Sequence, residues 1–129
     1  MENRLDERQR RLKDEFARLR GYWSDDIWGP ILEMDPDFFE AYLQFSSVPW
    51  KRGVLSPKVK ELIYIAIDAA TTHLHEAGTR QHIRNALKVG ATKEEILEVF
   101  ELVSALGVHT ITMGVPALIG ELKKAGREV

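Results

Sequence analysis

The stretch SPKVKELIYIAIDAATTHLHEAGTRQHIRNALKVG, residues 56–90, decides the fold. Ser56 is a typical helix N-cap and Pro57 a typical first helical residue, so a helix is predicted to begin here. Apolar residues then recur at helical spacing, at Leu62, Ile65, Ala66, Ala69 and Ala70. Gly78 indicates a break, and Gly90 is suited to end a second helix as a left-handed C-cap. We therefore predict two packed helices with a polar junction that carries histidines.

The N-terminal third of the chain contains two further helix signals. Residues 2–20 carry a narrow apolar stripe at Leu5, Leu12, Phe16 and Leu19, typical of a helix that is either packed on a body or mostly solvated. Gly21 is predicted to end it, and residues 22–34 form a connector. Asp35 and Pro36 then start an aromatic helix, and the proline- and glycine-containing residues 46–55 are predicted to be a loop.

The C-terminal third is also predicted to be helical. Thr92 and Glu95 have the spacing of a capping box. Residues 108–125 are predicted to form the last helix, with an interruption or kink near Pro116. Period-two alternation of apolar residues is absent from the sequence, so we predict an all-α antiparallel bundle of five to six helices.

Composition limits the classes of function. The 129 residues carry a net charge of −2, which gives no reason to expect nucleic acid or an anionic membrane as a partner. No apolar run appears long enough to span a bilayer, so no transmembrane segment is expected, and a cytoplasmic location follows by default. The chain has no cysteine, which excludes disulfides, thiolate metal sites and thiol redox chemistry.

Candidate chemistry gathers in residues 56–90. Glu61 and Asp68 lie seven residues apart and share a helix face. A buried Glu61 could relay protons to a histidine or form a salt bridge with Lys58, Lys60 or Arg84. His73 and His75 would point about 200° apart on a helix, whereas an extended turn could present either one. His75 is seven residues after Asp68 and would share its face, so we prefer His75 as a pocket residue. The set Glu61, Asp68, His73, His75 and His82 offers enough ligands for zinc, but because His-x-His diverges on a helix we predict no metal.

Three segments resemble the carboxymuconolactone decarboxylase family, which includes alkylhydroperoxidase D-like proteins. They are LSPKVKELI, HIRNAL and GATKEEILEV, within residues 55–116. The resemblance implies one domain over residues 1–129, with 1–34 as an N-terminal helical extension, and a trimeric or hexameric homo-oligomer. It places the family's glutamate on Glu61 and its histidine on His82. The cysteines of the peroxidase branch fall on His75 and Gly78, so thiol peroxidase activity is not expected.

The resemblance therefore implies a cofactor-free decarboxylase or related lyase that acts on a small carboxylated lactone or ring acid. His82 or His75 would donate a proton and Glu61 would orient or recharge the donor. Arg80 or Arg84 would hold a substrate carboxylate, and His73 and His109 are further candidates for the pocket. Structural roles are the alternative for each residue: surface pairing for the arginines and backbone contacts for His109. The alternative function is a non-catalytic, oligomeric helical binding protein.

Overall fold

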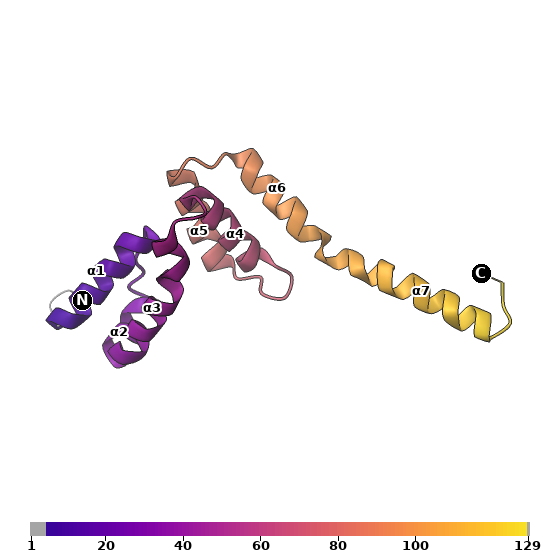
Figure 1. The fold of residues 1–129 in the computed structure, drawn as a ribbon, viewed down its shortest axis with the longest axis horizontal. Helices are drawn as coiled ribbons and strands as arrows, with labels where there is room; N and C mark the ends of the chain where they lie inside the picture. The colour runs from indigo at the N-terminus through magenta and orange to yellow at the C-terminus, as the bar shows by residue number, and fades with distance from the viewer. Residues whose placement is uncertain (1–4, 129) are drawn as a thin grey trace. The chain divides into compact units, whose positions relative to one another are not determined.

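The computed structural model describes residues 5–128, and all regular structure in this range is helical (Figure 1). Counting the continuous stretch Lys93–Lys124 as one helix gives six helices, which confirms the predicted all-α class. The chain divides into two compact units, residues 1–60 and 61–129, each of which is described by itself. The single domain expected for residues 1–129, with 1–34 as an extension, stays a prediction.

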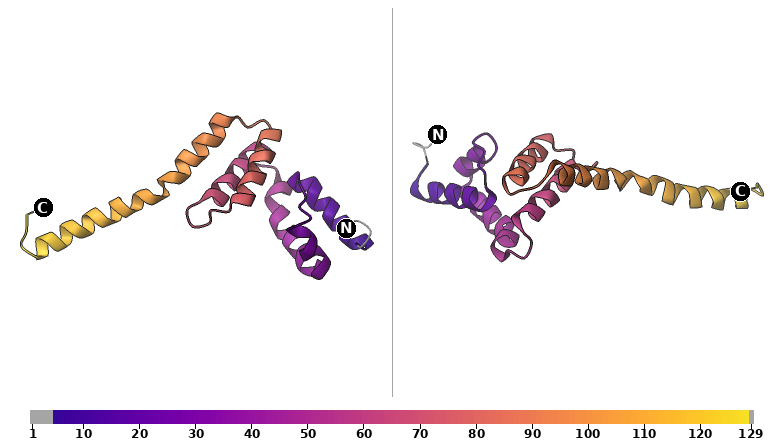
Figure 2. Two further views of the ribbon diagram at one scale, coloured as in Figure 1. Left: turned by 180° about the vertical axis from the view of Figure 1, so that it is seen from behind. Right: turned by 90° about the horizontal axis from the view of Figure 1, so that it is seen from above.

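The first unit contains α1 (Glu7–Arg20), α2 (Trp28–Met34) and α3 (Pro36–Arg52), which lie side by side (Figures 1 and 2). Its core consists of Leu5, Leu12, Phe16, Leu32, Phe39 and Leu43. Phe16 is fully buried, and its ring makes close contacts with those of Tyr22, Trp23, Trp28 and Phe39. Because aromatic burial stabilises a small core strongly, α1 packs on a body and is not a solvated helix.

α1 begins at Glu7, later than the predicted residue 2, whereas its end at Gly21 and the start of α3 follow the predicted signals. Asp6 forms a capping box with Gln9, and Gly21 ends α1 with a left-handed φ of 72°. Part of the helix predicted from residue 2, including Glu2, lies outside the described residues. The Asp35 side chain accepts a hydrogen bond from the Phe38 backbone N–H, which caps α3 as predicted.

The loop predicted for residues 46–55 is wrong over residues 46–52, because α3 continues through Pro49 and ends only at Arg52; residues 53–55 lie outside the helix as predicted. Proline removes one backbone hydrogen bond, but the helix continues to Arg52. Ser47 is fully buried, and the Trp50 ring contacts the cationic groups of Arg20 and Lys60. The helix stops at Gly53, whose φ of 67° is the left-handed conformation that glycine adopts most readily.

The second unit contains α4 (Pro57–Ala69) from Glu61 onward, α5 (Glu76–Lys88) and α6 (Lys93–Ser104). Ile65, Ala86, Ala91 and Ile96 form its core. As predicted, the Ser56 hydroxyl accepts a bond from the Val59 N–H at the start of α4, and Gly90 has a φ of 88°. Thr92 and Glu95 form the expected capping box at the start of α6.

The last helix continues from α6 through a 3-10 turn, η2 (Ala105–Val108), into α7 (His109–Lys124). α7 passes through Pro116, so the predicted interruption is absent. Apolar side chains on this stretch are exposed, among them Leu102, Ile111, Met113 and Leu118. By length and composition alone, Lys93–Lys124 is long and apolar enough to cross a membrane, contrary to the expectation that no such stretch exists.

Candidate functional site

A buried carboxylate–imidazole pair joins α4 to α5. Glu61 Oε2 lies 2.7 Å from His82 Nδ1, and the two side chains are only 3% and 8% exposed. A carboxylate can only accept, so the imidazole Nδ1–H donates. The Asn85 amide donates to the second Glu61 oxygen at 3.5 Å. The structure thus brings Glu61 and His82 together as a hydrogen-bonded pair, which is what a buried carboxylate requires.

The ring of Tyr64 lies flat against the His82 imidazole. The ring centroids are 4.7 Å apart, and the planes differ by 13°. Tyr64 follows Glu61 by one helical turn, so both groups lie on the face of α4 that meets α5. Stacking on one side and a hydrogen bond at Nδ1 together fix the orientation of the imidazole, and its Nε2 edge therefore has a defined direction.

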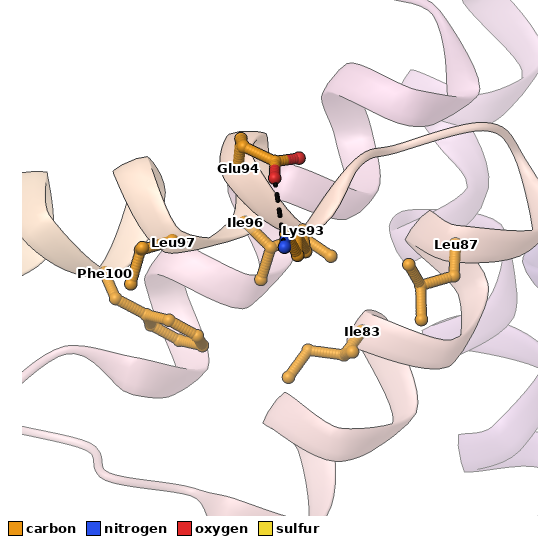
Figure 3. Close-up of a pocket in the computed structure, with 7 residues that line it drawn as sticks. All are labelled: Ile83, Leu87, Lys93, Glu94, Ile96, Leu97 and Phe100. Atoms are coloured by element: carbon orange, nitrogen blue, oxygen red, sulfur yellow. Dashed lines mark ion pairs between the residues drawn. The ribbon is translucent and has the colours of Figure 1, made fainter.

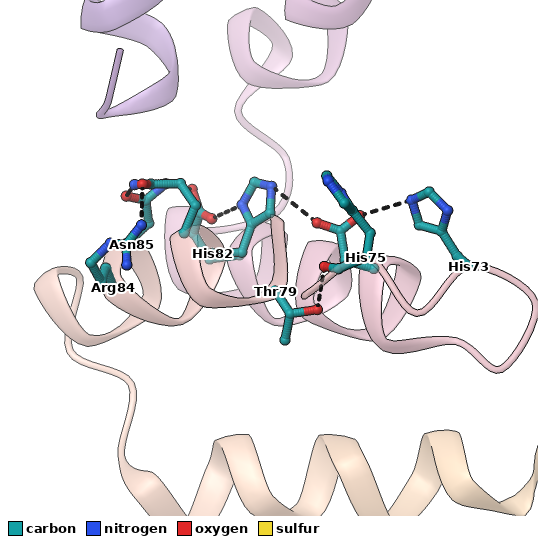
Figure 4. A network of polar contacts seen from close by, with 9 residues as sticks. His73, His75, Thr79, His82, Arg84 and Asn85 are labelled. Atoms are coloured by element: carbon teal, nitrogen blue, oxygen red, sulfur yellow. Dashed lines mark hydrogen bonds and ion pairs between the residues drawn. The ribbon is translucent and has the colours of Figure 1, made fainter. Parts of the chain in front are cut away.

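Asp68 contacts His82 and the two histidines of the next loop, His73 and His75. Figure 4 shows these three histidines in one network of polar contacts. Its Oδ2 is 3.9 Å from His82 Nε2. Its Oδ1 is 3.4 Å from His73 Nε2 and 3.8 Å from His75 Nδ1. The Asp68 side chain is 12% exposed, whereas those of His73 and His75 are about half exposed. One largely buried carboxylate therefore contacts three imidazoles through two different oxygens.

The histidines meet because α4 ends at Ala69 and residues 70–75 form a tight connection. Backbone N–H groups of His73 and Leu74 bond to the Ala70 carbonyl, and that of His75 bonds to the Asp68 carbonyl at 2.8 Å. Leu74 has a φ of +46°, a left-handed conformation that costs an L-residue about 1–2 kcal/mol. It places the two histidine rings 5.3 Å apart, so the divergence expected for a helical His-x-His does not occur.

Gly78 is inside α5, and the break predicted there is wrong. A Cβ at this position would lie 2.1 Å from Asp68 Oδ2 and 2.6 Å from His75 Nδ1. These separations are far below van der Waals contact, so only a glycine lets the carboxylate and the imidazole approach the helix this closely. The helix break lies instead at residues 70–75, where the chain must turn for Asp68 to face His75.

Of the remaining predicted site residues, Arg84 joins this network only at its edge, through Gln81 and Asn85, and Arg80 and His109 make their polar contacts elsewhere. Arg80 pairs with Glu76 at 2.7 Å on the exposed side of α5, and Arg84 donates to Gln81 at 2.7 Å. Arg80 also lines a cavity of about 420 Å³ beside Leu74 and Thr79. His109 is exposed at the start of α7, where Nδ1 lies 3.4 Å from the Thr112 hydroxyl. Their substrate-binding roles stay predictions.

A second, mostly apolar groove of about 520 Å³ lies between α5 and α6 (Figure 3). Its walls are Ile83 and Leu87 from α5 and Ile96, Leu97 and Phe100 from α6. An ion pair between Lys93 and Glu94, at 3.5 Å, lies at the groove. The groove has no imidazole in its lining, and Lys93 and Glu94 are its ionisable side chains, so it offers a mainly apolar surface.

Sequence reasoning missed Tyr64 and Asn85, and it considered Asp68 as a metal ligand but gave it no catalytic role. Each had a signal in its spacing. Tyr64 is three residues after Glu61, Asn85 three after His82, and Asp68 seven after Glu61, so each shares a helix face with a candidate residue. The contacts themselves could be predicted only once it was known that α4 packs against α5.

The fold and this pair define an all-helical protein with a buried glutamate–histidine dyad between two core helices. The sequence profile of the carboxymuconolactone decarboxylase family matches residues 36–118. The chain belongs to that family, as the resemblance in residues 55–116 predicted.

Among solved structures, the chain is similar to a protein of Burkholderia xenovorans LB400 provisionally named a gamma-carboxymuconolactone decarboxylase subunit. The two share 55% sequence identity, with a TM-score of 0.89 over 94% of this chain. The match covers 48% of the other chain, so this chain spans about half its length. A search of curated proteins gave no match.

Proposed function

We propose that the protein is a lyase that removes carbon dioxide from a small carboxylated lactone or ring acid. The observation that carries the proposal is the 2.7 Å contact between Glu61 and His82, two buried groups from neighbouring helices. Membership of the carboxymuconolactone decarboxylase family and the similar provisionally named structure support it. The chain has no thiol, which excludes thiol chemistry, and the glutamate–histidine pair offers acid–base chemistry.

The steps follow from the hydrogen bond at Nδ1. The bond between the substrate ring carbon and its carboxylate breaks, carbon dioxide leaves, and the electron pair stays on the ring as a dienolate. The imidazolium of His82 donates its Nε2 proton to that carbon and becomes neutral, with Nδ1–H still bonded to Glu61. Because the glutamate holds this tautomer and stabilises the imidazolium, it positions the donor. Arg80, beside the 420 Å³ cavity, would hold a second substrate carboxylate.

Turnover of carboxymuconolactone and related ring acids tests the proposal, with carbon dioxide release as the readout. His82→Ala should lower kcat by about 10²–10⁴-fold, the usual contribution of a positioned general acid. Glu61→Gln keeps the shape of the side chain and removes its charge, so kcat should fall while KM changes little. Lys124→Ala, which removes an exposed side chain near the end of α7, is the control and should retain activity. Equal rates for the wild type and His82→Ala would remove His82 from the mechanism.

We further propose that the protein works as a homo-oligomer in which a second copy covers the apolar surface of α6 and α7. Ile111 and Met113 are 65% and 68% exposed, far more than a stable apolar helix surface normally leaves in water. The stretch carries charges at its ends, at Lys93 and at Lys123 and Lys124. The family resemblance implies a trimer or hexamer, in which another copy of this chain would cover this surface with apolar side chains of its own.

If none of the ring acids turns over, the non-catalytic binding function becomes the better explanation. The groove between α5 and α6 supports that alternative, because five of its seven lining residues are apolar and neither Glu61 nor His82 is among them. Direct binding of ring acids, measured by calorimetry without turnover, would then be the expected result. Turnover that depends on His82 would exclude it.

A further inference from the structure

We propose that Asp68, His73 and His75 form a binding site for a divalent metal ion of the zinc type. The three side chains each offer one ligand atom, and all three atoms lie within 4.8 Å of one another. Two imidazoles and one carboxylate are ligands that zinc and similar first-row ions accept readily. The site shares no ligand with the Glu61–His82 pair, although Asp68 also contacts His82, and its proposal does not depend on the proposed lyase activity.

The distances between the ligand atoms suit a tetrahedral ion. Ligands about 2.0–2.2 Å from zinc in such a site are about 3.3–3.5 Å apart. His73 Nε2 and His75 Nδ1 lie 3.4 and 3.8 Å from Asp68 Oδ1. Both imidazoles are about half exposed, so their rings have room to turn toward a common centre. Three protein ligands leave one position for water or a substrate oxygen, the arrangement of catalytic rather than structural zinc sites.

Several features of the backbone hold these ligands in place. The His75 N–H bonds to the Asp68 carbonyl at 2.8 Å, which closes the loop between two of the ligands. Leu74 takes the left-handed conformation, with a φ of +46°, between the two histidines. Gly78 leaves the space that Asp68 Oδ2 and His75 Nδ1 occupy beside α5. The cluster is therefore assembled by the chain itself before any ion arrives, which lowers the ordering cost of binding.

The carboxylate also sets where the ion would lie relative to the dyad. Asp68 Oδ1 faces the two loop histidines, while Oδ2 lies 3.9 Å from His82 Nε2. An ion on Oδ1 would therefore be joined to the His82 ring through a single carboxylate, as outer-sphere groups are in many metal sites. The loop sequence His-Leu-His thus has a metal-binding geometry that its spacing on a helix would not provide.

Metal titration of the full chain tests the site. After removal of metals with a chelator, calorimetry with zinc chloride should show one ion bound per chain. Cobalt(II) should give the visible absorption bands of a four-coordinate site. His73→Ala and His75→Ala should each weaken binding by at least about tenfold, since even the loss of an outer-sphere partner has that effect. His109→Ala, which removes the exposed histidine of α7, is the matched control and should bind as the wild type does.

Circular dichroism of each variant shows whether weaker metal binding comes from the missing ligand or from unfolding. Because His73 and His75 are exposed, their replacement by alanine should leave the helix content unchanged. As a second measurement, the ring NMR signals of His73 and His75 should shift on addition of zinc while those of His109 stay in place. Failure of the wild type to bind zinc or cobalt would overturn the proposal. Binding that survives both loop substitutions, or that is lost only in His82→Ala, would also overturn it. None of these outcomes depends on lyase turnover.

Discussion

Replacement of Gly78 by alanine is the sharpest test of the packing at the site. Alanine is favoured over glycine inside a helix by about 0.8–1.0 kcal/mol, so propensity alone predicts a more stable protein. The new Cβ would lie 2.1 Å from Asp68 Oδ2, however. Normal carbon–oxygen contacts begin near about 3.3 Å, so the carboxylate has to move by about 1 Å or more.

That movement separates Asp68 from its imidazole partners. Overpacking of this kind usually costs about 1–3 kcal/mol, which exceeds the gain in propensity. We therefore expect Gly78→Ala to lower the free energy of unfolding by about 1 kcal/mol in urea titrations. Gly120→Ala is the matched control. It lies inside α7, and a Cβ added there would meet no heavy atom within 4 Å, so the substitution should be neutral or stabilising.

Histidine ring signals in NMR spectra provide a second readout for Gly78→Ala. The shifts of His75 and His82 should change, because both rings lie next to the displaced carboxylate. The signals of His109 should not change. A Gly78→Ala protein at least as stable as the wild type, with unchanged His75 and His82 shifts, would show that the close approach of Asp68 to α5 is wrong.

Two further predictions concern the rest of the chain. Light scattering should give the mass of a trimer or hexamer, with Ile111→Glu or Met113→Glu lowering that mass and Lys124→Glu leaving it unchanged; a monomeric wild type would contradict the proposed assembly. The Trp23 indole donates to Asp25 at 2.9 Å and holds the pKa of that carboxyl below its usual range. The ionised Asp25 carboxylate therefore stabilises the fold above the usual aspartate pKa, and this stabilisation is lost as the pH falls through the lowered pKa. The urea midpoint of Asp25→Asn should consequently change less with pH in the acid range than that of the wild type. Identical midpoints at every acid pH would refute this prediction.

Local signals in the sequence predicted most helix ends correctly. Asp35, Ser56 and Thr92 cap helices as expected, since capping depends on a side chain and a backbone group a few residues away. Three local signals for a break were wrong. Pro49 and Pro116 both lie inside continuous helices, and Gly78 serves close packing within α5.

The site was predictable only in part. The family resemblance placed Glu61 and His82, and the structure shows that they touch. The approach of His73 to His75 depends on the left-handed backbone of Leu74, a conformation that a leucine seldom adopts and that no spacing rule anticipates. The contacts of Tyr64 with His82 and of Asn85 with Glu61 depend on the packing of α4 against α5, which the sequence alone did not specify.

The position of Asp68 has a consequence for engineering. One side chain supports both the loop histidines and the buried imidazole, so the two halves of the network cannot be redesigned separately. A substitution that optimises one half will alter the electric field experienced by the other over a few ångströms of poorly solvated space. Directed evolution toward a new substrate would therefore be expected to yield paired changes, one in the connection after α4 and one on α5.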